Sequence, residues 1–315
     1  MDRVFNDVFE VPVSVEPYIH LIVTPQEERL VLLLADKPGT LEEIASGLGI
    51  SLQEAEELTG AAYHRAVINK DQENSGFYRT ATLYDRLGYF TQYEQEIWQS
   101  ISKEDRAAID DWYIGDFASR VKTQIDAEGD GFHRDDVLPI REALRVLAQA
   151  EEKAGKPYYV VPCNCRTTTN ACHFSVDTCI SNRYGPNSQW DRGYGRRLTW
   201  QELNELMLAL DKEGLMHTVA PSGHACNCET CCCYEFRAAL KLGTKGRYPR
   251  VLYVAELAQD KCVSCGICVK RCHFQAFSRD LQTRRVGFHP EKCWGCGICE
   301  ATCPKGAIHM AELRA

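Results

Sequence analysis

Eight of the chain's 17 cysteines form two copies of one spacing near the C-terminus, and this repeat constrains the fold more than any other feature. The first copy is Cys262-x-x-Cys265-x-x-Cys268-x-x-x-Cys272. The second, 31 residues later, is Cys293-x-x-Cys296-x-x-Cys299-x-x-x-Cys303-Pro304. A short CxxCxxC loop turns three thiolates onto three corners of a four-iron cubane, so the fourth ligand comes from elsewhere. Zinc knuckles and a disulfide scaffold are the alternatives, and two full copies at this spacing disfavour both.

Residues of about 251–315 resemble a bacterial dicluster ferredoxin. In proteins with this run, the fourth cysteine of each half ligates the cluster of the other half. The resemblance therefore implies two [4Fe-4S] clusters, one on Cys262, Cys265, Cys268 and Cys303 and the other on Cys293, Cys296, Cys299 and Cys272. Gly266 and Gly297 are expected to let the backbone approach the clusters closely. His273 departs from the pattern, because proline commonly follows the fourth cysteine.

The other nine cysteines form two groups in the middle of the chain: Cys163, Cys165, Cys172 and Cys179, then Cys226, Cys228, Cys231, Cys232 and Cys233. A lone buried cysteine behaves as a small hydrophobe, but three in a row cannot share one face of an element. We therefore expect metal binding, and C-x-C and CCC runs favour iron–sulfur over zinc. One or two further clusters are predicted. The simplest split separates the early group from four of the later five, and a crossed arrangement is equally allowed.

Three arginines and three histidines accompany these cysteines. Arg166, Arg196 and Arg197 either offset the negative charge of thiolate-ligated clusters, as cofactor-binding residues, or are solvated side chains. The histidines are candidate ligands that are more simply explained as ordinary polar residues: His173, His217 and His224. The two cysteine groups are expected to meet in space. A helix of about 200–213, capped by the Thr199 segment, is expected to pack between them.

Residues 1–130 contain no cysteine and predict a mostly helical domain. A short amphipathic helix begins at Thr40, and Ser51 with Glu54 forms a capping box that opens a second helix running to about His64. Strand-prone pieces at 66–68 and 77–80 follow, and then a helical stretch at about 103–125. The order helix, turn, helix, hairpin resembles the winged helix-turn-helix superfamily.

The charge of this domain argues against a DNA partner. Net charge is −14 over residues 1–130 and +3 over each of 131–250 and 251–315. The second predicted helix carries Glu54, Glu56 and Glu57 where a DNA reader brings basic and amide side chains. Because DNA affinity comes largely from neutralising phosphates, we expect this domain to bind protein rather than nucleic acid.

The whole arrangement resembles a group of bacterial and archaeal 4Fe-4S dicluster domain proteins, with a winged-helix-like start, CxCR and CNCxxCCC-like segments and a terminal ferredoxin. That resemblance implies a redox role in anaerobic metabolism. Glu229 and Thr230 replace a Cys and a Gly often found in the group, which leaves the later ligand set open. The predicted fold is α+β and multidomain: a helical winged-helix-like domain (1–130), a cysteine-rich α/β iron–sulfur domain (131–250) and a 2[4Fe-4S] ferredoxin domain (251–315). Loops at Glu128–Gly131 and Gly243–Arg247 are the expected boundaries.

We expect an electron-transfer protein that relays electrons between a ferredoxin-type donor or acceptor and a partner oxidoreductase. Two alternatives remain: a reductase with a catalytic cluster in the middle domain, and a redox-sensing transcriptional regulator. The sequence does not decide whether the chain is an enzyme, although it favours an electron-transfer component. A redox partner protein is expected, without nucleic acid or membrane insertion, and a homodimer is allowed. The N-terminus lacks a secretory signal, so a cytoplasmic location is expected.

Overall fold

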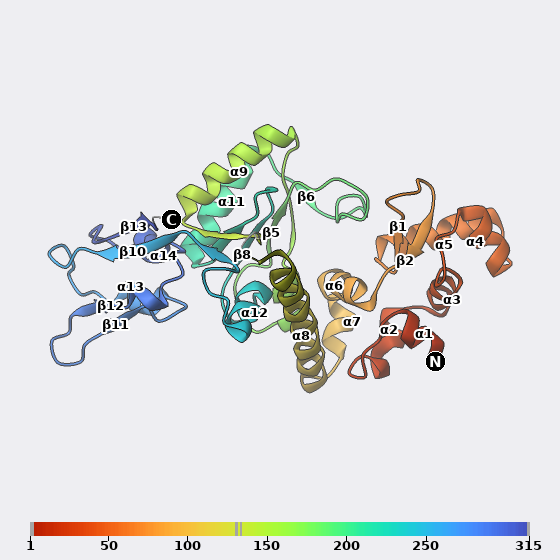
Figure 1. Cartoon of the computed structure of the whole chain (residues 1–315), viewed down its shortest axis with the longest axis horizontal. Helices are drawn as coiled ribbons and strands as arrows, with labels where there is room; N and C mark the ends of the chain where they lie inside the picture. Colours follow the sequence, from red (N-terminus) through yellow and green to blue (C-terminus); the bar gives the residue numbers. More distant parts are fainter. Residues whose placement is uncertain (1–2, 130–131, 133, 314–315) are drawn as a thin grey trace. The chain divides into compact units, whose positions relative to one another are not determined.

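The computed structural model describes residues 3–129, 132 and 134–313 (Figure 1). The chain divides into two compact units. The first contains residues up to Tyr113 together with 167–169 and 183–195, and the second contains 114–166, 170–182 and 196 onward. Part of the expected boundary loop, Asp130 and Gly131, lies outside the described residues. Among the described residues, no helix is both long and apolar enough to cross a membrane.

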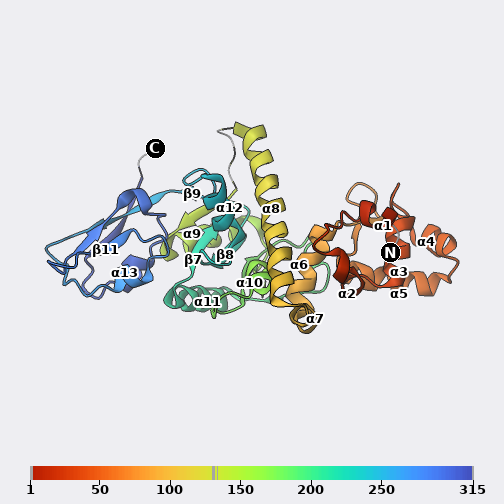
Figure 2. The same ribbon diagram turned by 90° about the horizontal axis from the view of Figure 1, so that it is seen from below.

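The first unit is mainly helical. Its elements are α1 (Arg3–Val8), η1 (Glu16–Tyr18), α2 (Ile19–Ile22), α3 (Pro25–Leu33), α4 (Leu41–Leu48), α5 (Leu52–His64), β1 (Ile68–Lys70), β2 (Tyr78–Thr80), α6 (Leu83–Tyr93), α7 (Gln95–Ser100) and the start of α8 (Lys103–Glu128), the long helix of Figure 2. The expected helix, turn, helix and hairpin are formed by α4, α5, β1 and β2. The capping box of Ser51 and Glu54 is present, so this local expectation is confirmed.

A loop from the middle of the sequence completes this unit. Arg192 is buried, and its guanidinium donates to the carbonyl oxygens of Tyr63 and, at 3.0 Å, Ile68. Tyr194 stacks on Tyr93 with ring centroids 3.7 Å apart. Residues 183–195 therefore pack with the N-terminal helices and the β1–β2 hairpin.

The second unit is built on a seven-stranded sheet of order β6-β4-β5-β8-β7-β3-β9. Its elements are β3 (Asp136–Leu138), α9 (Ile140–Ala154), β4 (Tyr159–Pro162), α10 (Asn164–Thr169), β5 (Asp177–Ser181), β6 (Arg196–Arg197), α11 (Trp200–Glu213), β7 (Met216–Val219), β8 (Ala225–Cys228), α12 (Tyr234–Leu242) and β9 (Arg250–Val251). The last three residues of α10 belong to the first unit. The strands pair antiparallel except β3 with β9.

Helices cover both faces of this sheet (Figure 1). On one face, α9 and α11 bury Leu147, Leu203 and Met207 against alternate strand residues such as Ile180 and Ala225. The strand residues between them face α12 on the other side, where the buried cysteines lie. The expectation that the helix at 200–213 packs between the cysteine groups is therefore wrong. That helix covers the opposite face, because its apolar stripe fits the apolar strand residues rather than the thiols.

In the C-terminal part of this unit, the two halves of the cysteine repeat have similar backbone conformations. Its elements are β10 (Tyr253–Leu257), α13 (Ile267–Arg271), β11 (Phe277–Arg279), β12 (Val286–Phe288), η3 (Pro290–Lys292), α14 (Ile298–Thr302) and β13 (Ile308–Glu312). β10 pairs with β13, and β11 pairs with β12. Positive φ angles recur at the same offset of 31 as the cysteines: Ser264 (54°) and Gly295 (71°), Gly266 (76°) and Gly297 (80°), Gln275 (56°) and Gly306 (55°). One residue, Leu252, separates β9 of the sheet from β10.

Candidate metal centres

The thiols of the C-terminal repeat lie in two groups. Burial raises the pKa of Cys299 well above its usual value, and neighbouring thiols add to this shift. These neighbours are Cys296, Cys293 and Cys272. In the first half, burial raises the pKa of Cys268 to about 11, with smaller contributions from Cys262 and Cys265. Cys272 of the first run thus lies with the second run, which is the placement that crossed ligation requires.

Backbone amides point at sulfur in both halves. Each half donates one N–H two residues after its first cysteine and one N–H four residues after its fourth cysteine. The pairs are Ser264 to Cys262 (3.4 Å), Gly295 to Cys293 (3.4 Å), Ala276 to Cys272 (3.3 Å) and Ala307 to Cys303 (3.2 Å). Hydrogen bonds of this kind favour the charged thiolate, the form that ligates metal. The residues present therefore fit two iron–sulfur clusters.

Glycine is required in this region for two different reasons. A Cβ atom at Gly295 would lie 2.4 Å from the carbonyl oxygen of Tyr253, and one at Gly297 would lie 2.8 Å from Cβ of Pro139. At Gly266 the nearest atom is 3.9 Å away, so only its positive φ favours glycine. The close approach expected at Gly297 is thus made to protein atoms, and Gly295 makes another.

The nine middle thiols fall into three groups, and the first contains Cys163, Cys165, Cys228 and Cys233. Hydrogen bonds from the thiols of Cys165 and Cys228 lower the pKa of Cys163. Cys228 in turn contacts Cys233, and the backbone N–H of Tyr234 donates to Sγ of Cys165 at 3.4 Å. This four-thiol group, as we call it, takes two ligands from each cysteine-rich segment. The contacts of these thiols match a crossed arrangement rather than the simplest split, and the assignment of ligands to clusters stays a prediction.

Arg166 is the predicted arginine that reaches sulfur. Its side chain is buried, and Nη2 donates to Sγ of Cys228 at 3.8 Å and to the carbonyl oxygen of Asn227 at 3.3 Å. Arg196 and Arg197 are exposed on β6, and Arg196 forms an ion pair with Glu202 at 3.3 Å. No contact between these two arginines and a thiol is found among the described residues, so their role as cofactor-binding residues stays a prediction.

The second group brings two thiols to a histidine. The ligand atoms of Cys179, His224 and Cys226 all lie within 4.8 Å of one another. A hydrogen bond from Cys226, followed by the effect of His224, lowers the pKa of Cys179 to about 5. The interpretation of His224 as an ordinary polar residue missed this contact, although its position two residues before Cys226 was a signal. By contrast, His217 is buried with Nδ1 2.6 Å from Oδ1 of Asn227, and His173 is exposed.

The third group adds a carboxylate to three thiols. The ligand atoms of Cys172, Cys231, Cys232 and Glu229 lie within 4.8 Å of one another, and Cys231 is exposed. Sγ of Cys232 is 3.6 Å from Sγ of both Cys172 and Cys231. The carboxylate of Glu229 accepts the backbone N–H groups of Cys231 and Cys232. Sequence reasoning noted Glu229 only as a departure from a motif, not as a member of the group.

An apolar layer joins the four-thiol group to the C-terminal repeat. Phe274 and Trp294 stack with ring centroids 4.7 Å apart, and Phe236 of α12 lies 5.5 Å from each. The same cluster contains Cys163, Cys165, Cys228, Cys233 and, from the repeat, Cys296. Aromatic side chains and sulfur atoms therefore form one continuous buried layer between two groups of thiols.

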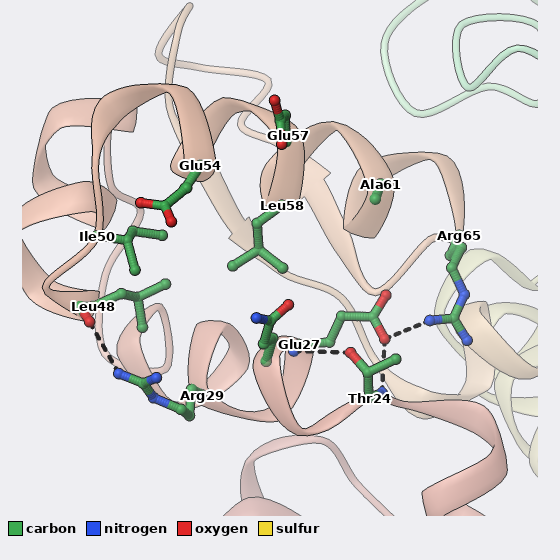
Figure 3. Close-up of a pocket in the computed structure, with 11 residues that line it drawn as sticks. Thr24, Glu27, Arg29, Leu48, Ile50, Glu54, Glu57, Leu58, Ala61 and Arg65 are labelled. Carbon is green, nitrogen blue, oxygen red and sulfur yellow. Dashed lines mark hydrogen bonds and ion pairs between the residues drawn. The ribbon is translucent and has the colours of Figure 1, made fainter.

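The first unit holds a pocket of about 410 Å³ between α3 and α5 (Figure 3). Its charged groups already have partners: Arg65 pairs with Glu27 at 2.6 Å, and Arg29 donates to the carbonyl oxygen of Leu48 at 3.0 Å. The pocket has no cysteine or histidine among its lining residues. The candidate chemistry of the chain therefore lies with the thiol groups of the second unit.

Comparison with known proteins identifies one segment. Residues 261–307 match the family model described as 4Fe-4S dicluster domain, and this range contains all eight cysteines of the repeat. No curated protein and no solved structure matches the chain. The C-terminal segment is thus a 4Fe-4S dicluster domain. A domain of this kind indicates iron–sulfur electron transfer. The cysteine groups of the middle segment have no counterpart in these comparisons.

Proposed function

We propose that this chain is an iron–sulfur electron-transfer protein in which the 4Fe-4S dicluster domain exchanges electrons with a third cubane on the four-thiol group. The proposal keeps the three-part layout: a winged-helix-like domain (1–130), an iron–sulfur domain (131–250) and a ferredoxin domain (251–315). The observation that carries it is the buried layer of Phe236, Phe274 and Trp294, which touches both groups of thiols. A partner oxidoreductase of anaerobic metabolism would take or supply the electrons.

The four-thiol group fits a cubane by its donor set. Four thiolates are the usual ligands of a [4Fe-4S] cluster. The four thiols form a continuous chain of contacts from Cys165 through Cys163 and Cys228 to Cys233. They therefore lie at one site, although they come from two distant segments of the sequence.

Cubanes held at these positions would supply reversible one-electron chemistry. The side chains around them would set the reduction potential. Arg166 places a buried positive charge against Cys228 and so stabilises the reduced, more negative state. Phe236 and Trp294 exclude water from the layer between the thiol groups, which lowers the local dielectric constant. The amide donors to sulfur act in the same direction as Arg166.

We propose that the N-terminal domain docks the redox partner rather than nucleic acid. Glu54, Glu56 and Glu57 are exposed on α5, and the domain's net charge of −14 repels a phosphate backbone. A basic protein surface is the complementary partner, and such attraction weakens with salt because the Debye length is about 8 Å at physiological ionic strength. Tight, salt-sensitive binding of duplex DNA would instead support the regulator alternative.

The direct test is metal analysis with electron paramagnetic resonance of the anaerobically purified full chain. We expect about twelve irons per chain, four for each of three cubanes. The fully reduced spectrum should show magnetic interaction between a middle cluster and a ferredoxin cluster. Cys228→Ser should remove about four irons and this interaction while leaving the interaction between the two ferredoxin clusters. About eight irons in the unmodified protein would contradict the third cubane.

One observation favours a reductase as the second candidate. Cys231 is exposed beside Cys172 and Cys232, so a metal bound there would be open to a substrate from solvent. Substrate-dependent reoxidation of the reduced protein, abolished by Cys231→Ser but not by Cys228→Ser, would identify that activity.

A further inference from the structure

Three metal-ligating side chains share one face of the central sheet. Ile180 of β5 pairs with Ala225 of β8 in antiparallel register, which places Cys179 directly opposite Cys226. His224 precedes Cys226 by two residues, and side chains two apart along an extended chain point to the same face. Local geometry thus brings the imidazole and both sulfur atoms together without any contribution from the ferredoxin repeat.

The distances between these ligand atoms indicate one metal ion rather than a cluster. Nε2 of His224 lies 3.3 Å from Sγ of Cys226 and 3.9 Å from Sγ of Cys179. A tetrahedral ion with bonds of about 2.3 Å to sulfur and about 2.0 Å to nitrogen holds its ligand atoms about 3.6–3.8 Å apart. The observed distances bracket this range.

We propose that Cys179, His224 and Cys226 bind a single zinc ion that is separate from the iron–sulfur clusters. Two thiolates and one imidazole form a borderline-soft ligand set that suits zinc, and zinc accepts tetrahedral geometry without a preference of its own. The site does not depend on the proposed electron-transfer function, because none of its ligands belongs to the four-thiol group or the repeat.

The fourth position of this zinc is open. Among the described residues, no other His, Cys, Asp or Glu atom joins the group within 4.8 Å. All three residues are half-buried. Catalytic zinc sites have three protein ligands and a water or substrate in the fourth position, whereas structural sites are closed by four protein ligands. The site is therefore of the open class, and a water molecule or a small anionic or thiol ligand completes it.

A disulfide between Cys179 and Cys226 is the main competing explanation. The two cysteines face each other across neighbouring strands, and both are free thiols in this structure. A disulfide accounts for two of the three side chains but gives no reason for the imidazole to approach both sulfurs.

The test is zinc-edge X-ray absorption on the full chain purified anaerobically from zinc-replete cells. This measurement is specific for zinc, so the iron clusters do not obscure it. We expect one zinc per chain with two sulfurs, one imidazole nitrogen and one further light atom as neighbours. His224→Ala should remove the imidazole signature. The His224→Ala variant should also bind Zn²⁺ more weakly in competition with a chelator. The loss of affinity should exceed the roughly 10- to 100-fold that follows removal of an outer-shell partner, because His224 is proposed to contact the ion directly.

His173→Ala is the matched control, since His173 is a histidine of the same segment that lies outside the group, and it should leave the zinc spectrum unchanged. Iron content and the cluster resonances report folding in each variant, and both should stay at their unmodified values. Three results would overturn the site: a Cys179–Cys226 disulfide without zinc, an unchanged zinc shell in His224→Ala, or a zinc shell of four sulfurs. A zinc shell of four sulfurs would place the zinc on the four-thiol group. If only the proposed zinc is missing, the electron-transfer proposal still stands, because its clusters use other ligands.

Discussion

Replacing Gly295 by alanine tests how closely the backbone packs around the second half of the repeat. Gly295 has a φ of 71°, and its added Cβ would meet the carbonyl oxygen of Tyr253 at 2.4 Å. Left-handed backbone costs an L-residue about 1–2 kcal/mol, which the reduced freedom of the unfolded chain offsets by about 0.4–1 kcal/mol. Overpacking against main-chain atoms that cannot move aside adds about 1–3 kcal/mol. We expect a net destabilisation of about 2–4 kcal/mol.

The repeat supplies the controls for this experiment. Gly306 has a φ of 55°, but no atom lies within 4 Å of its Cβ position, so Gly306→Ala carries only the backbone cost of about 1 kcal/mol or less. Ser264 occupies the position equivalent to Gly295 and already holds a side chain at a φ of 54°. Ser264→Gly should therefore change stability by less than about 1 kcal/mol.

The assay is the anaerobic rate of iron loss to a chelator, because the thiols of the second half are partly buried and a chelator gains full access only when the structure opens locally. Each 1.4 kcal/mol corresponds to a tenfold change in the open population. Gly295→Ala should lose iron roughly 30-fold faster or more, and Gly306→Ala within about 5-fold of the unmodified protein. Equal rates for the two variants would refute the claim that contact with Tyr253, rather than backbone conformation, makes glycine necessary.

Four further predictions follow from individual side chains. Trp294→Leu should slow electron exchange between the middle and ferredoxin clusters, measured after pulse reduction, while Phe274→Leu at the edge of the stack should slow it less. Arg166→Gln should make the midpoint potential of the proposed middle cluster more negative by about 180 mV, the value for a charge about 4 Å away at a dielectric constant of about 20. Arg166→Lys should keep the potential close to that of the unmodified protein in a redox titration. Arg192→Met should cost about 3 kcal/mol or more in thermal unfolding, because several buried acceptors lose their donor. Backbone N–H groups of the β1–β2 loop donate to the Asp71 carboxylate and lower its pKa. The stability that this carboxylate contributes is therefore present above its usual pKa of 3.8 and is lost as the pH falls through the lowered value. Asp71→Asn should abolish this part of the pH dependence when the free energy of unfolding is measured over a pH series.

Features with local causes were predictable from the sequence. The helix starts at Ser51 and Thr199 carry capping boxes, and the structure forms both. The repeat was equally clear, since one spacing of cysteines and glycines occurs twice. In these cases the residues that determine the structure lie within a few positions of one another.

Features that depend on strand pairing were not predictable. The sequence predicts that the early and late cysteines meet, but it does not predict which thiols come together. That depends on β5 and β8 being neighbours in the sheet, and no local pattern encodes this pairing. For the same reason the sequence does not show that His224 approaches two thiols, or that α11 packs on the face opposite the thiols rather than between the cysteine groups. The packing of residues 183–195 against the N-terminal helices depends on the buried contacts of Arg192, which are also distant in sequence.

The single residue between β9 and β10 limits how the dicluster domain can move relative to the sheet. A ferredoxin on a flexible tether can swing between a donor and an acceptor, and its reach increases with the length of the tether. Here Leu252 alone connects a strand of the sheet to the first strand of the dicluster domain, and its carbonyl oxygen accepts the backbone N–H of Leu313 at 2.8 Å. The dicluster domain is therefore connected rigidly to the sheet and does not move on a flexible tether. In the proposed electron-transfer function, donor and acceptor therefore have to come to this domain, and the rate of transfer depends on how fast they arrive and leave.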